Sequence, residues 1–404
     1  MKQFLIPAAV VALLHLAGCQ SSTKTKEADT ELANTPAAGS PDADTATQTT
    51  MIDYKLPDPK AFGGEKNGKT VTLHILKNDN LHVAITNFGA RVVGLLVPDK
   101  TGKLIDVVPG FATLKAYEAA NESFFGPIVG RFGNRIAKGR FTIDGKAYQT
   151  ELNNNGNTLH AGPTGFHNQV WDAKQIDDKS LELTYVSKDG EGGFPGTVTT
   201  KVIYTLTDTK GLRIDYTATT DKPTPYNPTN HAFFNLNGEG SGTINNHVLM
   251  IDADRFSAVD KGLIPQGEPI SVEGTPFDFR TPTAIGKRVN DKNEQLTFGA
   301  GYDHNFVLNK KSGGLAKGVE ITGDQSGIRM EVLTTEPAMQ FYGGNFFKGA
   351  DTGKYGKAIG YREAFALEAQ HYPDSPNHPT YPNTILRPGQ TYKQTTEYRF
   401  SVAK

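Results

Sequence analysis

The 404-residue sequence lacks the features that mark several large classes of protein. It contains a single cysteine, Cys19, which excludes both an intrachain disulfide and a CxxC zinc site. No two histidines lie three or four residues apart, as metal ligands on a helix would, and no GxSxG nucleophile elbow is present. The formal net charge of −1 gives no reason to expect a nucleic-acid partner. These features predict neither a metal nor a nucleic acid as a ligand.

Long helical repeats are also missing, and short alternating segments take their place. Apolar and polar residues alternate with a period of two in five segments: 71–76, 81–86, 198–206, 212–219 and 392–402. The first two predict a hairpin, and 43 glycines and 23 prolines divide the chain into similarly short pieces. Short helices are expected only near residues 114–119 and 282–289. We predict an all-β fold, a large antiparallel sandwich that spans residues 54–404 as one domain.

The first 18 residues have the form of an export signal. Lys2 precedes an apolar run, residues 4–16, which is too short to span a membrane as a helix. The run leads into Leu-Ala-Gly-Cys, which resembles the cleavage box of bacterial lipoproteins. That resemblance implies a signal peptide over residues 1–18, lipidation of Cys19 and attachment to a membrane of the cell envelope. Gln20, where an aspartate would indicate inner-membrane retention, favours the outer membrane; an ordinary secretory peptide with a chance cysteine is the alternative.

The segment after the cysteine, residues 19–53, is predicted to be a disordered tether. It is rich in Thr, Ala, Ser, Asp and Pro and has almost no large apolar residues. Such a segment cannot bury enough apolar surface to offset the conformational entropy that it would lose on folding. We expect it to let the folded domain stand clear of the membrane.

Residues 227–238 combine many amides with aromatic rings. Four asparagines surround His231, and Phe233 follows two positions later. Hydrogen-bonding amides beside flat apolar faces suit a polyhydroxylated ligand such as a sugar. The histidine adds a group that can move a proton near neutral pH. The segment predicts a sugar site without deciding between a lectin and an enzyme.

Four further clusters place polar side chains in loops or at strand ends, and their candidate residues are Asn134 with Arg135, His160, Asp303 and Glu368. Neighbouring glycines let the Arg135 guanidinium approach a ligand closely, although a surface turn with structural arginines also fits. His160 follows an asparagine-rich turn, where a histidine is more often structural than catalytic. Asp303 either orients a hydroxyl or caps a turn. Glu368 ends an apolar run, which makes it either a paired structural charge or a tuned base.

Taken in chain order, these clusters resemble the aldose 1-epimerases, the galactose mutarotase family. The similarity covers residues 54–402. Six motifs carry it: GRFGNRIAKGRF (130–141), NPTNHAFFNLNG (227–238), GTPFDFR (274–280), YDHNF (302–306), EPAMQFYGGNF (336–346) and the stretch 367–389, which includes YPDSPNHP and LRPG. The resemblance implies a twisted β-supersandwich of the galactose mutarotase type with an open sugar cleft. It also implies a free aldose as the partner and no cofactor, and it leaves the oligomeric state open.

The same resemblance assigns roles. His231 matches the family's general acid and Glu368 its general base. The sugar-contacting positions fall on Asn134, Arg135, His160, Phe233, Asp303 and Gln340. Ionised Glu368 would take the proton of the C1 hydroxyl while protonated His231 gives one to the ring oxygen. The opened aldehyde would then rotate about C1–C2 and close on its other face, and Arg135 is expected to help keep Glu368 ionised.

The sequence also departs from the family and leaves rival functions open. Ala161 follows His160 where glycine is common, and residues 165–168 differ from a common Gly-Phe-Asp-Lys pattern, so the preferred sugar is less defined than the reaction. One rival is glycoside hydrolysis, with Glu368 and Asp303 as the two carboxylates. A second is a carbohydrate-binding lipoprotein without catalysis. A third is a hexose-6-phosphate epimerase, for which no basic phosphate pocket is evident.

Overall fold

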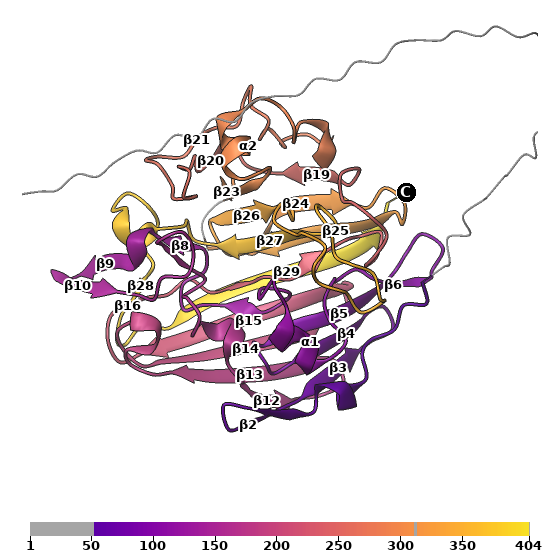
Figure 1. Cartoon of the computed structure of the whole chain (residues 1–404), viewed down its shortest axis with the longest axis horizontal. Coiled ribbons are helices and arrows are strands. Elements are labelled where there is room, and N and C mark those ends of the chain that lie inside the picture. Colours follow the sequence, from indigo (N-terminus) through magenta and orange to yellow (C-terminus); the bar gives the residue numbers. More distant parts are fainter. Residues whose placement is uncertain (1–51, 311–312, 404) are drawn as a thin grey trace, which may run out of the picture. The chain divides into compact units, whose positions relative to one another are not determined.

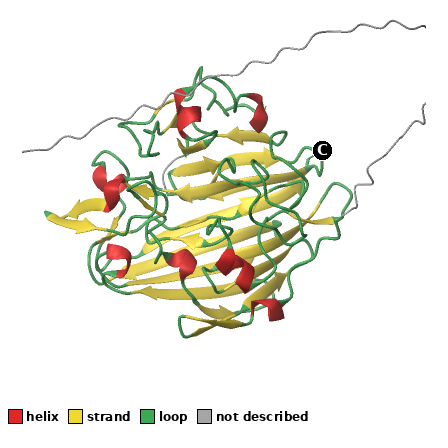
Figure 2. Cartoon of the chain, viewed as in Figure 1, coloured by secondary structure: helices red, strands yellow, loops and turns green. Residues whose placement is uncertain are grey.

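The computed structural model describes residues 52–310 and 313–403 (Figure 1). The predicted signal peptide, Cys19 and the predicted tether up to residue 51 lie outside the described residues. Ile52–Lys404 forms one compact unit. It is nearly all β, as predicted, with antiparallel sheets and a few short helices (Figure 2). Among the helices that the structure describes, none is long and apolar enough to cross a membrane.

The largest sheet has nine strands, and its neighbouring strands run antiparallel. In sheet order they are β12 (Asp172–Gln175), β13 (Ser180–Ser187), β14 (Val198–Leu206), β15 (Gly211–Thr220), β29 (Tyr392–Val402), β25 (Ile328–Thr334), β24 (Ala316–Thr322), β19 (Val248–Ile251) and β22 (Thr283–Ala284). In β15 every second side chain from Leu212 to Ala218 is buried and those between are half-exposed. This confirms the predicted alternation of residues 212–219, in which one face of the strand packs on the core.

A six-stranded sheet carries much of the candidate site. Its order is β18 (Phe233–Phe234), β27 (Phe365–Gln370), β26 (Ala338–Tyr342), β23 (Asp303–Val307), β20 (Arg255–Phe256) and β21 (Ile270–Ser271). Phe341 and Leu367 pack in the same apolar core as Ile214 and Tyr216 of the nine-stranded sheet. Because side chains alternate along a strand, the neighbouring Gln340 and Glu368 project from the opposite face. The two sheets therefore share one core and leave a polar face free for a site.

A four-stranded sheet completes the main layers, with β3 (Leu73–Lys77), β4 (His82–Thr86), β5 (Arg91–Pro98) and β6 (Leu104–Asp106). β3 and β4 pair antiparallel, which confirms the predicted hairpin. Residues 63–70 match the letters of a phosphate loop, GxxxxGKT. They form a different structure, a tight hairpin of β1 (Gly64–Lys66) and β2 (Lys69–Val71) whose turn has positive φ at both central residues. Because the strand β3 follows in place of a helix, this segment does not have the architecture of a phosphate-binding loop.

One predicted helix is confirmed and one is wrong. α1 spans Leu114–Ala119, where it was expected. Residues 282–289 instead form β22 and a single 3₁₀ turn. β22 pairs with β19, and the backbone N–H groups of Ile285 and Gly286 donate to the carbonyls of residues 247 and 245, just before β19. Tertiary pairing thus replaces the helical hydrogen bonds. The helix of this region begins later, as α2 (Glu294–Phe298).

Candidate active site

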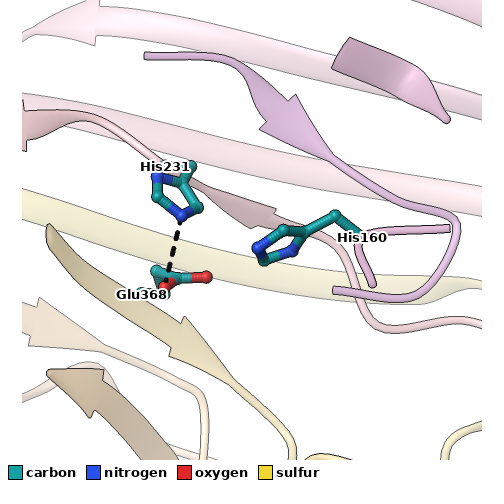
Figure 3. A group of neighbouring side chains, drawn as sticks. All are labelled: His160, His231 and Glu368. Carbon is teal, nitrogen blue, oxygen red and sulfur yellow. Dashed lines mark ion pairs between the residues drawn. The ribbon is translucent and has the colours of Figure 1, made fainter. Parts of the chain in front are cut away.

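The two residues predicted to move protons lie side by side. Glu368 projects from β27, and His231 stands in the short connection between β17 (Thr229–Asn230) and β18. The Nε2 atom of His231 is 3.5 Å from Oε1 of Glu368, and the two side chains face each other in Figure 3. The side chains are only 5% and 3% exposed, which keeps bulk water from most of their surface. The arrangement is that of a buried acid–base pair.

The pair lines a cleft of about 460 Å³, within the size range of small-molecule sites. Its other predicted members are Asn134, Arg135, His160 and Asp303, so six of the eight predicted site residues line the same cleft. The cleft is also lined by residues that were not among the predicted site residues: Asn121, Glu122, Ser123, Phe124, Asn153, Asn154, Asn155, Leu159, Lys261, Leu263, Phe298, Tyr342 and Phe346. The lining mixes amides, charges and aromatic rings, as a site for a polyhydroxylated ligand requires.

Asn134 and His160 hold each other in place. The backbone N–H of Asn134 donates to Nδ1 of His160 at 3.1 Å, and the N–H of His160 donates to the carbonyl of Asn134 at 3.0 Å. Leu159, beside His160, pairs with Arg135 between β11 (Thr158–Leu159) and β8 (Arg135–Ile136). Because Nδ1 accepts a hydrogen bond, the ring proton of neutral His160 is on Nε2. His160 therefore presents a hydrogen-bond donor to the cleft.

This tautomer bears on whether the cleft suits a metal ion. Ligand atoms of His160, His231 and Glu368 lie within 4.8 Å of one another. A neutral imidazole binds a metal through a lone pair, and the lone pair of His160 is at Nδ1, where it accepts the Asn134 amide. The group therefore fits a hydroxyl-bearing ligand better than a cation.

Asp303 is held between two neighbours. Gln340 donates to it from Nε2 at 2.7 Å, and the Arg135 guanidinium lies 3.8 Å from its other oxygen. Gln340 stands directly opposite Glu368 in the β26–β27 pairing. Gln340 itself is 3% exposed and is not among the residues that line the cleft in the described structure. The structure places it behind Asp303, as a support for that carboxylate.

Phe233 does not occupy the predicted sugar-contacting position. Its ring is fully buried, packs 4.9 Å from the ring of His231, and also contacts the rings of Phe125 and Phe347. It therefore supports the imidazole from behind. The phenyl and phenol rings that reach the cleft belong to Phe124, Phe298, Tyr342 and Phe346.

The four asparagines around His231 also have a different role from the predicted one. All four are buried, and among the described residues none of them lines the cleft. Asn227 bonds to the backbone of His371, and Asn235 donates to the carbonyls of residues 242 and 363. The amides satisfy internal backbone groups, which removes the penalty of burying them. The asparagines of this segment therefore stabilise the loop through internal hydrogen bonds and do not contact the sugar.

Burial determines the protonation of the acid–base pair. Desolvation lowers the pKa of His231 to about 4. Desolvation, followed by the charge of Asp303, raises the pKa of Glu368 well above its usual value. Arg135 acts in the predicted direction, but its effect on the pKa of Glu368 is smaller. In the empty cleft the pair is therefore favoured as neutral imidazole and carboxylic acid, with one proton between them.

Sequence reading missed the loop at residues 121–125. Asp351 accepts from the backbone N–H of Asn121 and Glu122, and Arg91 donates to the carbonyls of residues 123 and 125. These bonds hold Glu122 and Phe124 at the cleft. Burial and the charge of Asp351 raise the pKa of Glu122 to about 7. No motif marks this loop, because its position depends on partners distant in the sequence.

Comparison with known proteins agrees with this geometry. The family model for aldose 1-epimerase matches residues 72–399. The galactose mutarotase of Bos taurus is 42% identical over 335 residues, which is 83% of this chain and 95% of that protein. The aldose 1-epimerase of Escherichia coli K12 is 37% identical over 337 residues, covering 83% of this chain and 96% of the relative.

Solved structures show the same architecture. An aldose epimerase homologue from C. elegans superposes with a TM-score of 0.76 at 31% identity, over 83% of this chain and all of that one. The galactose 1-epimerase of Lactobacillus acidophilus gives a TM-score of 0.74 at 27% identity, over 84% of this chain and 97% of that one. The predicted galactose mutarotase-like fold is confirmed.

Proposed function

Since the chain belongs to the aldose 1-epimerase family, whose members are isomerases, we propose that it interconverts the α and β anomers of free aldohexoses such as glucose and galactose. His231 and Glu368 are the proton-transfer pair. The observation that carries the proposal is their 3.5 Å separation in a cleft lined by hydrogen-bonding side chains. In a cyclic aldose the hydroxyl oxygen and the ring oxygen O5 are both bonded to C1. Two proton-transfer groups this close together can reach both oxygens, one taking a proton while the other gives one.

One shared proton is enough for the whole reaction. In the bound sugar the C1 hydroxyl donates a hydrogen bond to ionised Glu368, and O5 accepts one from protonated His231. These bonds favour the microstate with imidazolium His231 and ionised Glu368. Glu368 then accepts the proton of the C1 hydroxyl as the C1–O5 bond breaks, and His231 donates its proton to O5. This leaves neutral His231 and protonated Glu368, the state that burial favours. After rotation about C1–C2, Glu368 returns its proton to the carbonyl oxygen while O5 attacks C1 and gives its proton to His231.

Other side chains orient the sugar. His160 donates a hydrogen bond to the sugar from Nε2, and Arg135 donates from its guanidinium. The neighbouring Asp303 carboxylate accepts hydrogen bonds from sugar hydroxyls. Asn134 stands between His160 and Arg135, and its side-chain oxygen accepts the N–H of Arg135 at 2.9 Å. Phe124 and Tyr342 supply apolar faces for the C–H surface of the ring. No cofactor enters this scheme.

The proposal predicts faster equilibration of freshly dissolved α-D-glucose or α-D-galactose with a bell-shaped pH dependence. Below the pKa of His231, about 4, both groups are protonated and no base remains. Above the raised pKa of Glu368 both protons are lost and no acid remains. Polarimetry at each pH, with the buffer rate subtracted, gives kcat/KM. An acid limb near the ordinary histidine value of about 6.5 would contradict the assignment of the pair.

Two assays separate the rival functions. No acceleration over buffer with any of several aldoses would exclude a free-aldose epimerase and favour a carbohydrate-binding protein. Release of reducing sugar from a glycoside would instead indicate hydrolysis with Glu368 and Asp303 as the two carboxylates. An isomerase leaves the glycoside intact, because its C1 oxygen carries no proton to remove.

We propose further that the chain is a lipoprotein of the bacterial cell envelope, anchored in the outer membrane through lipidated Cys19. The support is the short apolar run, the Leu-Ala-Gly-Cys box and Gln20 after it. Acyl chains on one terminus give firm attachment when more than one is present. Metabolic labelling with a fatty acid should mark the protein, and cell fractionation should find the labelled protein with the membranes. A Cys19→Ala variant that still takes up label would refute the proposal.

A further inference from the structure

Asn227 joins the segment of His231 to the strand of Glu368. Its side-chain oxygen accepts the backbone N–H of His371 at 2.9 Å, and its Nδ2 donates to the His371 carbonyl at 3.3 Å. The amide thus imitates the edge of a β-strand. β27 ends at Gln370, one residue before this contact, and Asn227 is fully buried.

The backbone of Asn227 holds a third segment. Its N–H donates to the carbonyl of Arg131 at 2.8 Å, and its carbonyl accepts the N–H of Gly133 at 2.7 Å. Residues 131–133 lead directly to Asn134 and Arg135, which line the cleft. One residue therefore contacts the segments that carry the acid, the base and part of the sugar-binding wall.

The segment of His231 and the strand of Glu368 are joined at two points, by two different kinds of hydrogen bond. At one end Phe233 pairs with Ala366 through the β18–β27 ladder. At the other end two hydrogen bonds of the Asn227 side chain join residues 227 and 371. His231 and Glu368 lie between these two points. The hydrogen bonds of the ladder join backbone groups and so persist when a side chain is replaced. The connection between residues 227 and 371 depends on the side-chain amide of Asn227.

We propose that Asn227 is a positioning residue that fixes the separation of His231 and Glu368. The inference rests on the proposed proton-transfer role of that pair. At neutral pH the amide meets both demands of His371, an acceptor for its N–H and a donor for its carbonyl. A carboxylate would supply the acceptor and repel the carbonyl, and an alkyl chain would leave both groups buried without a partner.

The test compares Asn227→Leu with the wild-type chain by polarimetry on α-D-glucose. We expect kcat to fall about 10–100-fold, since a misplacement of about 1 Å can cost a factor of 10². KM should change less, because the backbone bonds to residues 131 and 133 remain and the sugar-binding wall keeps its place. Circular dichroism establishes that the measured protein is folded.

A matched control separates positioning from general loss of stability. Asn87 is 5% exposed and bonds through its side chain to backbone groups of residues 70, 72 and 171, away from the cleft. Asn87→Leu should lower the melting temperature and leave kcat of the folded protein unchanged. An equal loss of kcat in both variants, or unchanged kcat in folded Asn227→Leu, would overturn the proposal.

Asn227→Asp provides a second test of the proposal, which can be measured even if the leucine variant does not fold. A protonated aspartic acid has the acceptor and the donor of asparagine, and the ionised form lacks the donor. The kcat of this variant relative to wild type should therefore rise as the pH falls through the pKa of the new carboxyl group. A ratio independent of pH would contradict the proposal. A wild-type chain without activity would overturn the proposed function instead.

Discussion

Replacing Glu368 with glutamine is expected to lower kcat for anomerisation by about 10²–10⁴-fold, the usual contribution of a positioned acid or base. Glutamine has nearly the shape of glutamate but cannot take the C1 hydroxyl proton. Asp303, another carboxylate of the cleft wall, is engaged by Gln340 and Arg135 and is not free to replace it. Polarimetry with saturating α-D-glucose measures the loss, and wild-type rates would show that Glu368 is not the base.

The same substitution should leave the fold intact. Burial raises the pKa of Glu368 above its unfolded value, so the folded chain holds this proton more tightly. The stabilisation that follows is complete at low pH and is lost as the pH rises through the folded pKa. Glutamine does not titrate, so the melting temperature of the variant should equal or exceed that of wild type at the alkaline end. The control is Glu363→Gln, five residues before Glu368 in the chain. It removes a carboxylate that accepts the backbone N–H of Gly360 and should keep full activity.

Much of this site could be predicted because its residues lie in short, recognisable motifs. His231 and Glu368 are far apart in sequence, and their contact depends on the pairing of β18 with β27. The resemblance to a known family brought them together before the sheet order was known. Period-two alternation likewise predicted β15, because one face of that strand packs on the core.

The failures share one physical cause, which is that a residue type does not reveal what lies next to it. Phe233 and Phe234 are consecutive in a strand, so their rings point to opposite sides and each enters a different apolar cluster. The four asparagines of this segment bond to backbone groups that the sequence does not place nearby. Glu122 reaches the cleft through bonds from Asp351 and Arg91 that no local pattern shows.

Replacing His231 with asparagine is expected to lower kcat by a similar factor, about 10²–10⁴. The amide is polar and fits the space of the imidazole, but it neither gives up nor accepts a proton near neutral pH. His167→Asn is the matched control, since His167 is also buried and also contacts the ring of Phe124, at 4.8 Å. Among the described residues it does not line the cleft, so this variant should keep kcat.

Combining His231→Asn with Glu368→Gln tests whether the two groups share one proton, as their 3.5 Å separation indicates. If each acts only through the other, the double variant should be about as slow as the slower single variant, and the two losses should not multiply. A double variant slower than both by the product of their factors would mean that each group moves its proton independently. In that case water or another cleft residue, such as Glu122 with its pKa of about 7, completes the transfer. The triple variant with Glu122→Gln would then fall further, whereas with a single shared proton the added substitution leaves the residual rate unchanged.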